Sequence, residues 1–78
     1  MKVIYSLHAL ERMRQRGISK ELVALCVQSP DKKEEVGGVY RCVRKINDKV
    51  IVVICRQEDD KIIVITSYLS SKIRKYLG

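Results

Sequence analysis

The apolar residues of this chain follow a helical period in the first 30 residues and an alternating period in the rest. This single change of period constrains the fold more than any other feature. Ser6 stands at the N-cap position of a helix predicted over Leu7–Arg16, and Gly17 stands where that helix ends. A second helix is predicted to begin after Ser19 and to end before Pro30, because proline cannot continue a helix. The first part of the chain is therefore predicted to be helical.

Three runs with the composition of β-strands fill the second part, separated by short polar turns. Asn47-Asp48 and Asp59-Asp60 have hairpin spacing, which predicts antiparallel pairing of consecutive strands. The runs are Val39–Ile46, Val50–Gln57 and Ile62–Leu69. We also expect a short edge strand at Lys2–Tyr5, a polar loop at Asp31–Gly38 and a short C-terminal helix within Ser70–Gly78. The sequence thus predicts one α+β domain over residues 1–78, in the order β-α-α-β-β-β followed by the short helix.

Alternation along the three long strands sorts their residues onto two faces of the sheet. One face carries Tyr40, Cys42, Arg44, Ile46, Ile51, Val53, Cys55, Val64, Thr66 and Tyr68. The other carries Val39, Arg41, Val43, Lys45, Val50, Val52, Ile54, Arg56, Ile63, Ile65 and Ser67. The second set has the more continuous aliphatic block, so we predict that the helices cover it. Tyr40, Arg44, Thr66 and Tyr68 are then expected together on a partly open face.

Size and charge limit the function. A domain of this length buries only about 60–65% of its unfolded surface, so its core is thin and we expect no large cofactor. The formal net charge of +7, from 16 Lys and Arg against 9 Asp and Glu, indicates an anionic partner. No apolar run reaches the roughly 18 residues that span a bilayer. The N-terminus also turns polar too soon for a secretory signal, so we expect a cytoplasmic protein that does not enter a membrane.

The three cysteines are Cys26, Cys42 and Cys55, an odd number without a Cys-x-x-Cys pair. With the single histidine, His8, they could formally make a zinc site. However, structural zinc sites usually draw paired ligands from tight turns, and these cysteines fall within a helix and two strands. We therefore predict no metal site and interpret the thiols as small buried apolar groups.

The most informative stretch lies in the first predicted helix. His8, Arg12 and Arg16 are spaced four apart and share one face of that helix. Imidazole can accept or donate a proton near neutral pH, and guanidinium groups suit phosphate oxygens. These residues could therefore bind a phosphodiester, with His8 placed for acid–base chemistry. Alternatively, the arginines are solvated or pair with Glu11 and Glu21, and His8 makes only a local hydrogen bond.

The pattern H-x-x-x-R-x-x-x-R-G-I-S, which begins at His8, resembles the opening of domain-of-unknown-function family 4258, a group of short bacterial and archaeal proteins. The resemblance continues in Ser29-Pro30-Asp31, in the apolar middle strand and in Ile65-Thr66-Ser67-Tyr68, and it spans nearly the whole chain.

The order of elements is also similar to that of RelE-like and colicin-type ribonucleases, in which a small sheet presents basic and aromatic side chains to an RNA phosphate without a metal. This resemblance implies a site formed by His8, Arg12, Arg16, Arg44, Thr66 and Tyr68. The chain departs from RelE-like toxins in lacking a clear C-terminal catalytic Tyr or His pair, for which Tyr76 is a weak substitute.

The leading hypothesis is a metal-independent ribonuclease, the toxin of a toxin–antitoxin pair, in which the ribose 2′-hydroxyl attacks the adjacent phosphate. His8 would be the general base or acid, and Arg12, Arg16 and Arg44 would stabilise the oxyanionic transition state. Tyr68 would orient the scissile nucleotide or assist the proton transfer. Tyr40, Arg41, Arg44 and Thr66 are the expected RNA-binding residues of the sheet.

The expected partners are RNA, including RNA on the ribosome, and an acidic antitoxin protein. Two other classes of function fit the same residues. In one, the arginines only neutralise phosphates, and the protein is a non-catalytic nucleic-acid- or protein-binding module. In the other, the protein is a regulatory adaptor that pairs through an exposed edge of its sheet.

Overall fold

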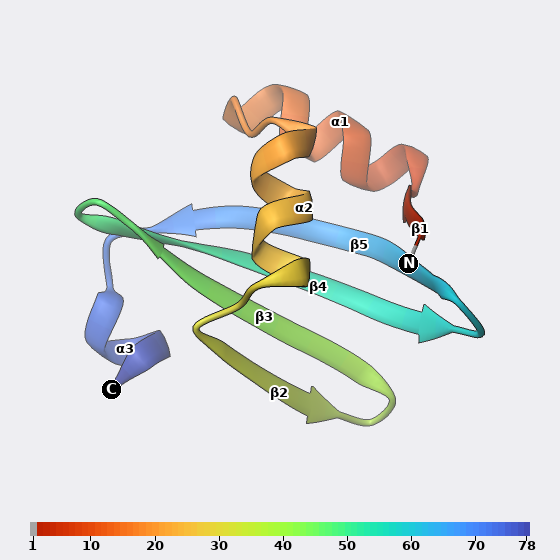
Figure 1. The fold of residues 1–78 in the computed structure, drawn as a ribbon. Helices are drawn as coiled ribbons and strands as arrows, with labels where there is room; N and C mark the ends of the chain where they lie inside the picture. The colour runs from red at the N-terminus through yellow and green to blue at the C-terminus, as the bar shows by residue number, and fades with distance from the viewer. Residues whose placement is uncertain (1) are drawn as a thin grey trace.

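The structure, a computed structural model, describes residues 2–78 and shows one sheet with helices on both of its faces (Figure 1). Its elements are β1 (Lys2–Tyr5), α1 (Leu7–Arg16), α2 (Lys20–Gln28), β2 (Lys32–Val36), β3 (Val39–Ile46), β4 (Lys49–Glu58), β5 (Lys61–Ser70) and α3 (Ile73–Leu77). The predicted α+β class and the short C-terminal helix are confirmed. No helix in the described range has the length and apolar character needed to cross a membrane.

The sheet has five strands in the order β1-β5-β4-β3-β2. Strands β3, β4 and β5 are consecutive antiparallel neighbours, as the two turns predict. The sheet is nevertheless mixed and two strands wider than that meander, because β1 pairs in parallel with β5 and β2 pairs with β3.

The predicted loop at Asp31–Gly38 is wrong, because Lys32–Val36 forms the edge strand β2, antiparallel to β3. Gly37 and Gly38 join the two strands with φ angles of 61° and 81°. Positive φ at both central positions is what a type I′ hairpin turn requires. The strand sequence Lys-Lys-Glu-Glu-Val has no apolar alternation, so β2 depends on this turn and on β3. Its charged side chains also suit an exposed sheet edge.

The two long helices begin and end where the sequence indicates. The Ser6 side chain accepts a hydrogen bond from the Ala9 backbone N–H at 3.0 Å, and Gly17 ends α1 in the left-handed conformation. The Ser19 side chain accepts from the Leu22 backbone N–H at 3.1 Å and begins α2. These caps satisfy backbone groups that the helices themselves leave free.

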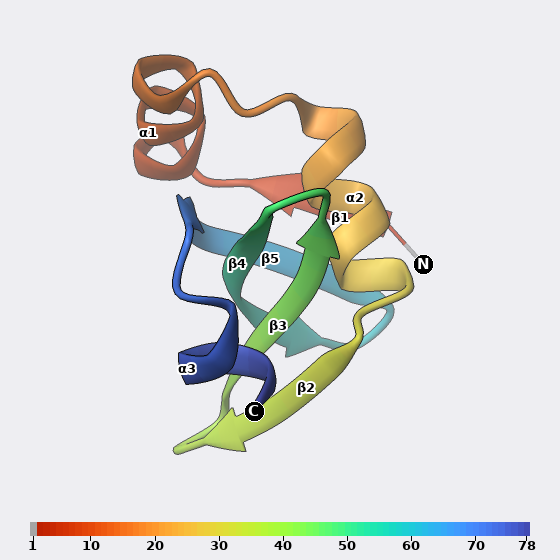
Figure 2. The same cartoon turned by 90° about the vertical axis from the view of Figure 1, so that its left-hand side faces the viewer.

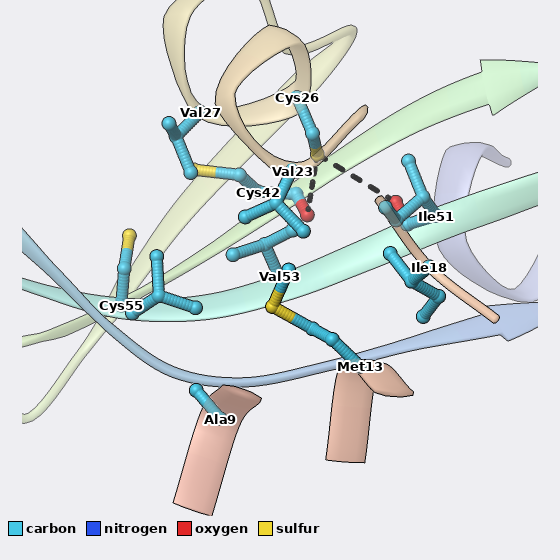
Figure 3. Packing of buried hydrophobic residues seen from close by; sticks show 11 residues of the cluster. Ala9, Met13, Ile18, Val23, Cys26, Val27, Cys42, Ile51, Val53 and Cys55 are labelled. Atoms are coloured by element: carbon cyan, nitrogen blue, oxygen red, sulfur yellow. Dashed lines mark hydrogen bonds between the residues drawn. The ribbon is translucent and has the colours of Figure 1, made fainter. Parts of the chain in front are cut away.

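Helices α1 and α2 cover the sheet face opposite to the one predicted. Figure 3 shows the residues buried between these helices and the sheet. Beneath α1 and α2 lie Cys42, Ile51, Val53, Cys55 and Val64, packed against Ala9, Met13, Ile18, Val23, Cys26 and Val27. The other face carries Val43, Val50 and Val52, and α3 covers it with Tyr76. Both faces are apolar because both are covered, so alternation alone could not identify the face that lies beneath α1 and α2.

A β-bulge in β5 makes a further change of face. Two neighbouring residues of β4 are paired with Val64 and Thr66, so Ile65 between them is an extra residue. An extra residue reverses the facing of every residue that follows it. Thr66 and Tyr68 therefore leave the face of Val64 and lie on the α3 face. Ser67 points the other way and is fully buried beneath the helices.

Candidate nucleic-acid interface

The stripe of His8, Arg12 and Arg16 forms on α1 as predicted. Ala9 and Met13 are the buried residues of this helix and fix the side that faces the sheet. The stripe lies on a flank next to that side, and all three of its residues are exposed. An anion in solvent can therefore reach these side chains without displacing an apolar contact of the helix.

Arg16 ties this flank to the edge of the sheet. Strand β1 pairs with β5 only from Lys61 to Val64, and α1 then runs beside β5 toward its C-terminal end. There, Nη1 of Arg16 donates a hydrogen bond to the backbone carbonyl of Ser67 at 2.6 Å. This guanidinium therefore bonds a carbonyl at the edge of β5, in the part of the strand that β1 does not pair with. The other N–H groups of the guanidinium remain available to a ligand.

Arg12 is not paired with the carboxylates considered for it. Its Nη1 lies 3.4 Å from Oε1 of Gln15 on the same helix, a long and exposed contact. Among residues 2–78, the ion pairs involve Lys32, Arg41 and Arg56, and none includes a residue of α1. Pairing of Arg12 and Arg16 with Glu11 and Glu21, the alternative interpretation of the sequence, is therefore not seen in the described part of the chain.

Two of the expected RNA-binding residues, Arg44 and Tyr40, lie on the sheet face that α1 and α2 cover, and each makes a contact within the protein there. Nη1 of Arg44 donates to the Ser29 carbonyl at 2.5 Å, at the C-terminal end of α2, where a positive charge stabilises a helix. Tyr40 packs against the core, and Nζ of Lys33 lies 4.5 Å from the centre of its ring. Both residues therefore make structural contacts on the sheet face that α1 and α2 cover, whereas the remaining sheet candidates lie on the opposite face.

The other three candidates, Arg41, Thr66 and Tyr68, lie on the α3 face. The hydroxyl of Tyr68 is 3.1 Å from that of Tyr76, and their rings meet edge to face at a centroid distance of 6.2 Å. Arg41 lies 5.5 Å above the Tyr76 ring and binds Oε1 of Glu34 at 2.6 Å. The predicted site is therefore divided between the two faces of the sheet.

The environment of Tyr68 also determines its protonation. Burial, and then the hydrogen bond with Tyr76, raise the pKa of Tyr68 from 10.0 to about 12, although the charge of Arg41 opposes the change. A tyrosine is already protonated at neutral pH, and the raised pKa makes loss of the proton harder still, so Tyr68 can donate a hydrogen bond but is a poorer general base than an ordinary tyrosine.

Helix α1, which carries the stripe, and helix α3 lie on either side of the C-terminal end of β5. In Figure 2, α1 lies above the C-terminal end of β5 and α3 lies below it. Three exposed cations accompany α3, namely Lys72, Arg74 and Lys75. The site prediction left out this basic group. The basic, amphipathic tail sequence is the signal that could have included it.

The cysteines do not extend the site. Cys26, Cys42 and Cys55 are free thiols buried in the core. The Sγ of Cys26 contacts the carbonyl oxygens of Cys42 at 3.4 Å and Ile51 at 3.8 Å (Figure 3), and burial raises the pKa of Cys26 to about 12. Within residues 2–78, no three His, Cys, Asp or Glu side chains are grouped so that they could hold a metal ion. All three thiols thus belong to the buried core and not to the exposed basic surface.

Comparison with known proteins identifies a family for this chain. The family described as "Domain of unknown function (DUF4258)" matches residues 5–68, a span that includes α1, α2, β2, β3, β4 and β5 as far as Tyr68 but only the last residue of β1. No curated protein and no solved structure matches the chain. The similarity to RelE-like and colicin-type ribonucleases is therefore not confirmed.

Proposed function

We propose that this chain, which belongs to the DUF4258 family, binds RNA through the flank of α1 and cleaves it by attack of a ribose 2′-hydroxyl on the adjacent phosphate. The observation that carries the proposal is the exposed stripe of His8, Arg12 and Arg16, in which neither arginine has a carboxylate partner among residues 2–78. Guanidinium groups contact phosphate oxygens with two parallel hydrogen bonds, and the net charge of +7 favours the approach of a polyanion.

The proposed chemistry uses the stripe as a unit. A neutral His8 takes the proton of the 2′-hydroxyl, the 2′-oxygen forms a bond to phosphorus, and the bond from phosphorus to the 5′-oxygen breaks. The products are a 2′,3′-cyclic phosphate and a 5′-hydroxyl, which receives the proton from the imidazolium or from water. Arg12 and Arg16 stabilise the additional negative charge of the transition state. Because the nucleophile is part of the substrate, this reaction requires no metal-bound water.

Tyr68 has a smaller role than the sequence suggested. It lies on the α3 face, whereas His8 is on a helix that covers the other face, and its raised pKa makes the phenol harder to deprotonate than an ordinary tyrosine. We therefore assign Tyr68 to RNA binding and not to proton transfer. Arg44 supports the end of α2 and is not assigned to the transition state.

The test is a cleavage assay with purified protein and RNA. We expect His8→Ala to lower the cleavage rate by about 100-fold or more, the usual contribution of a positioned acid or base. RNA affinity should change little, because a neutral imidazole contributes almost no charge. Arg12→Ala should weaken both binding and cleavage, since an arginine on the phosphate acts in the ground state and in the transition state. EDTA should leave the rate unchanged.

Arg14→Ala is the matched control. Arg14 is also exposed on α1 but lies on the opposite flank, beside Leu10 and Glu11, so its loss should affect neither step. Circular dichroism of each variant confirms folding. Cleavage that persists undiminished in His8→Ala would remove His8 from the mechanism, and wild-type protein that binds no RNA would end the proposal.

A second candidate function is RNA binding without cleavage. The position of Tyr68 favours it, because the division of the predicted site leaves His8 without this second acid–base group. In that case wild-type protein binds RNA through Arg12 and leaves it intact, and the same assay separates the two functions.

A further inference from the structure

We infer that the RNA bound by this protein is single-stranded and bends around the C-terminal edge of β5, contacting α1 on one side of the sheet and α3 on the other. This inference rests on the proposed RNA binding and specifies the form of RNA that the surface accepts. Its basis is the location of exposed cations on two elements that lie on opposite sides of one strand end (Figure 2).

The first contact surface is the flank of α1. Its Arg16 reaches the Ser67 carbonyl, so the positive charge of α1 extends to the strand edge itself. Strand β1 ends opposite Val64, and the part of β5 beyond this point borders α1 without a further strand between them. An RNA strand on Arg12 and Arg16 is therefore already at the edge of the sheet.

The second contact surface is α3 and the residues before it. Tyr76 anchors this helix to the sheet and is 7% exposed, whereas Lys72, Arg74 and Lys75 face solvent. Nζ of Lys75 lies 5.6 Å from the centre of the Tyr76 ring, next to Tyr68. Tyr68 beside it is only partly buried, and cations next to a partly exposed aromatic ring suit a single strand, whose phosphates and bases can both make contact.

The stiffness of the RNA decides which form can use both surfaces. Duplex DNA stays nearly straight over roughly 500 Å, and A-form RNA also presents a regular helix, whereas this molecule is 32 Å in its longest dimension. A duplex can thus lie on α1 or on α3 but cannot turn around the end of β5 to reach both. A single strand can bend within a few nucleotides, so only single-stranded RNA gains both sets of contacts.

The experiment compares a single-stranded oligonucleotide of about 12 nucleotides with the duplex of the same sequence, by fluorescence anisotropy at 0.1 M salt. Arg12→Ala removes an α1 contact, and the pair Arg74→Gln with Lys75→Gln removes α3 contacts. Lys61→Gln is the control, because Lys61 is exposed at the opposite end of β5. Cleavage does not interfere if the 2′-hydroxyls are methylated, and thermal unfolding confirms that each variant folds.

We expect each lost phosphate contact to weaken single-strand binding about fivefold at this salt concentration, since it removes about 0.7 from the slope of log K against log salt. Arg12→Ala and the α3 pair should both weaken the single strand, and Lys61→Gln should not. Duplex binding should be weakened by only one of the two, Arg12→Ala or the α3 pair, because a duplex contacts only one of the two surfaces.

If Arg12→Ala weakens single-strand binding but the α3 pair does not, RNA binds α1 alone. The bent path is then wrong and the proposed function stands. If both sets of variants weaken the duplex as much as the single strand, the preference for single strands is wrong. If neither form of RNA binds wild-type protein, the proposed function itself fails.

Discussion

At the scale of single residues, the stripe on α1 forms from local spacing alone, whereas the partners of Arg16 and Arg44 come from distant parts of the chain. The stripe of His8, Arg12 and Arg16 could be predicted because residues four apart in a helix share a face whatever the rest of the chain does. The hydrogen bond between Arg16 and the Ser67 carbonyl joins residues 51 positions apart, and no local pattern indicates it. The same is true of Arg44, whose partner is the Ser29 carbonyl at the end of α2.

Tyr68 gives a prediction for alkaline pH. Its pKa is raised from 10.0 to about 12 in the folded protein by burial and by the hydrogen bond with Tyr76. A raised pKa means that the folded state holds the proton more tightly than the unfolded chain. The resulting stabilisation is present in full below about pH 10 and is lost as the pH rises from there through about 12.

The check is a spectrophotometric titration of tyrosinate at 295 nm, with circular dichroism to follow folding. The wild type should show a step near pH 12 that Tyr68→Phe removes, whereas Tyr40→Phe should leave that step in place. If the step near pH 12 persists unchanged in Tyr68→Phe, that step belongs to another residue.

At the scale of elements, the sequence indicates where helices and turns begin and end but not which face of the sheet is covered. Caps and two-residue turns are local signals, and the structure confirms those predicted at Ser6, Ser19, Asn47-Asp48 and Asp59-Asp60. The bulge at Ile65 has no local signal, because its neighbours have ordinary strand composition. It moves Thr66 and Tyr68 to the other face and so divides the predicted site.

Strand β2 cannot be predicted from its own residues, because Lys-Lys-Glu-Glu-Val does not favour a strand. The turn at Gly37 and Gly38, which joins β2 to β3, is therefore the main local feature that favours its formation. We expect Gly38→Ala to lower the free energy of unfolding by about 1 kcal/mol, because alanine is disfavoured at the φ of 81° found there. In a domain of this size the melting temperature should fall by about 4–8 °C. Nothing lies within 4 Å of the position of an added Cβ, so the cost comes from the backbone alone.

Gly38→Asn is the control, since asparagine tolerates positive φ better than alanine. Thermal unfolding followed by circular dichroism should place its melting temperature between those of the wild type and Gly38→Ala. Equal melting temperatures for all three proteins would show that β2 does not depend on this turn.

At the scale of the whole molecule, the sheet is covered on both faces, yet α1 and α3 leave basic residues exposed on either side of the same strand end (Figure 2). Composition predicted an anionic partner but could not place it, since net charge carries no position. The fold shows only where exposed positive charge lies, because α1 runs along the edge of β5 and α3 packs on the opposite face. The central claim is that the charge on one flank of α1 meets RNA phosphates.

The most direct test of that claim is the salt dependence of single-stranded RNA binding by wild-type protein, Arg12→Ala and Arg14→Ala. Both variants lose one positive charge from the same helix, so an effect of net charge alone would be equal in the two. We predict that log K falls linearly with log salt, that Arg12→Ala makes the slope shallower by about 0.7, and that Arg14→Ala keeps the wild-type slope. Equal slopes for the two variants, or wild-type binding that is indifferent to salt, would contradict the claim.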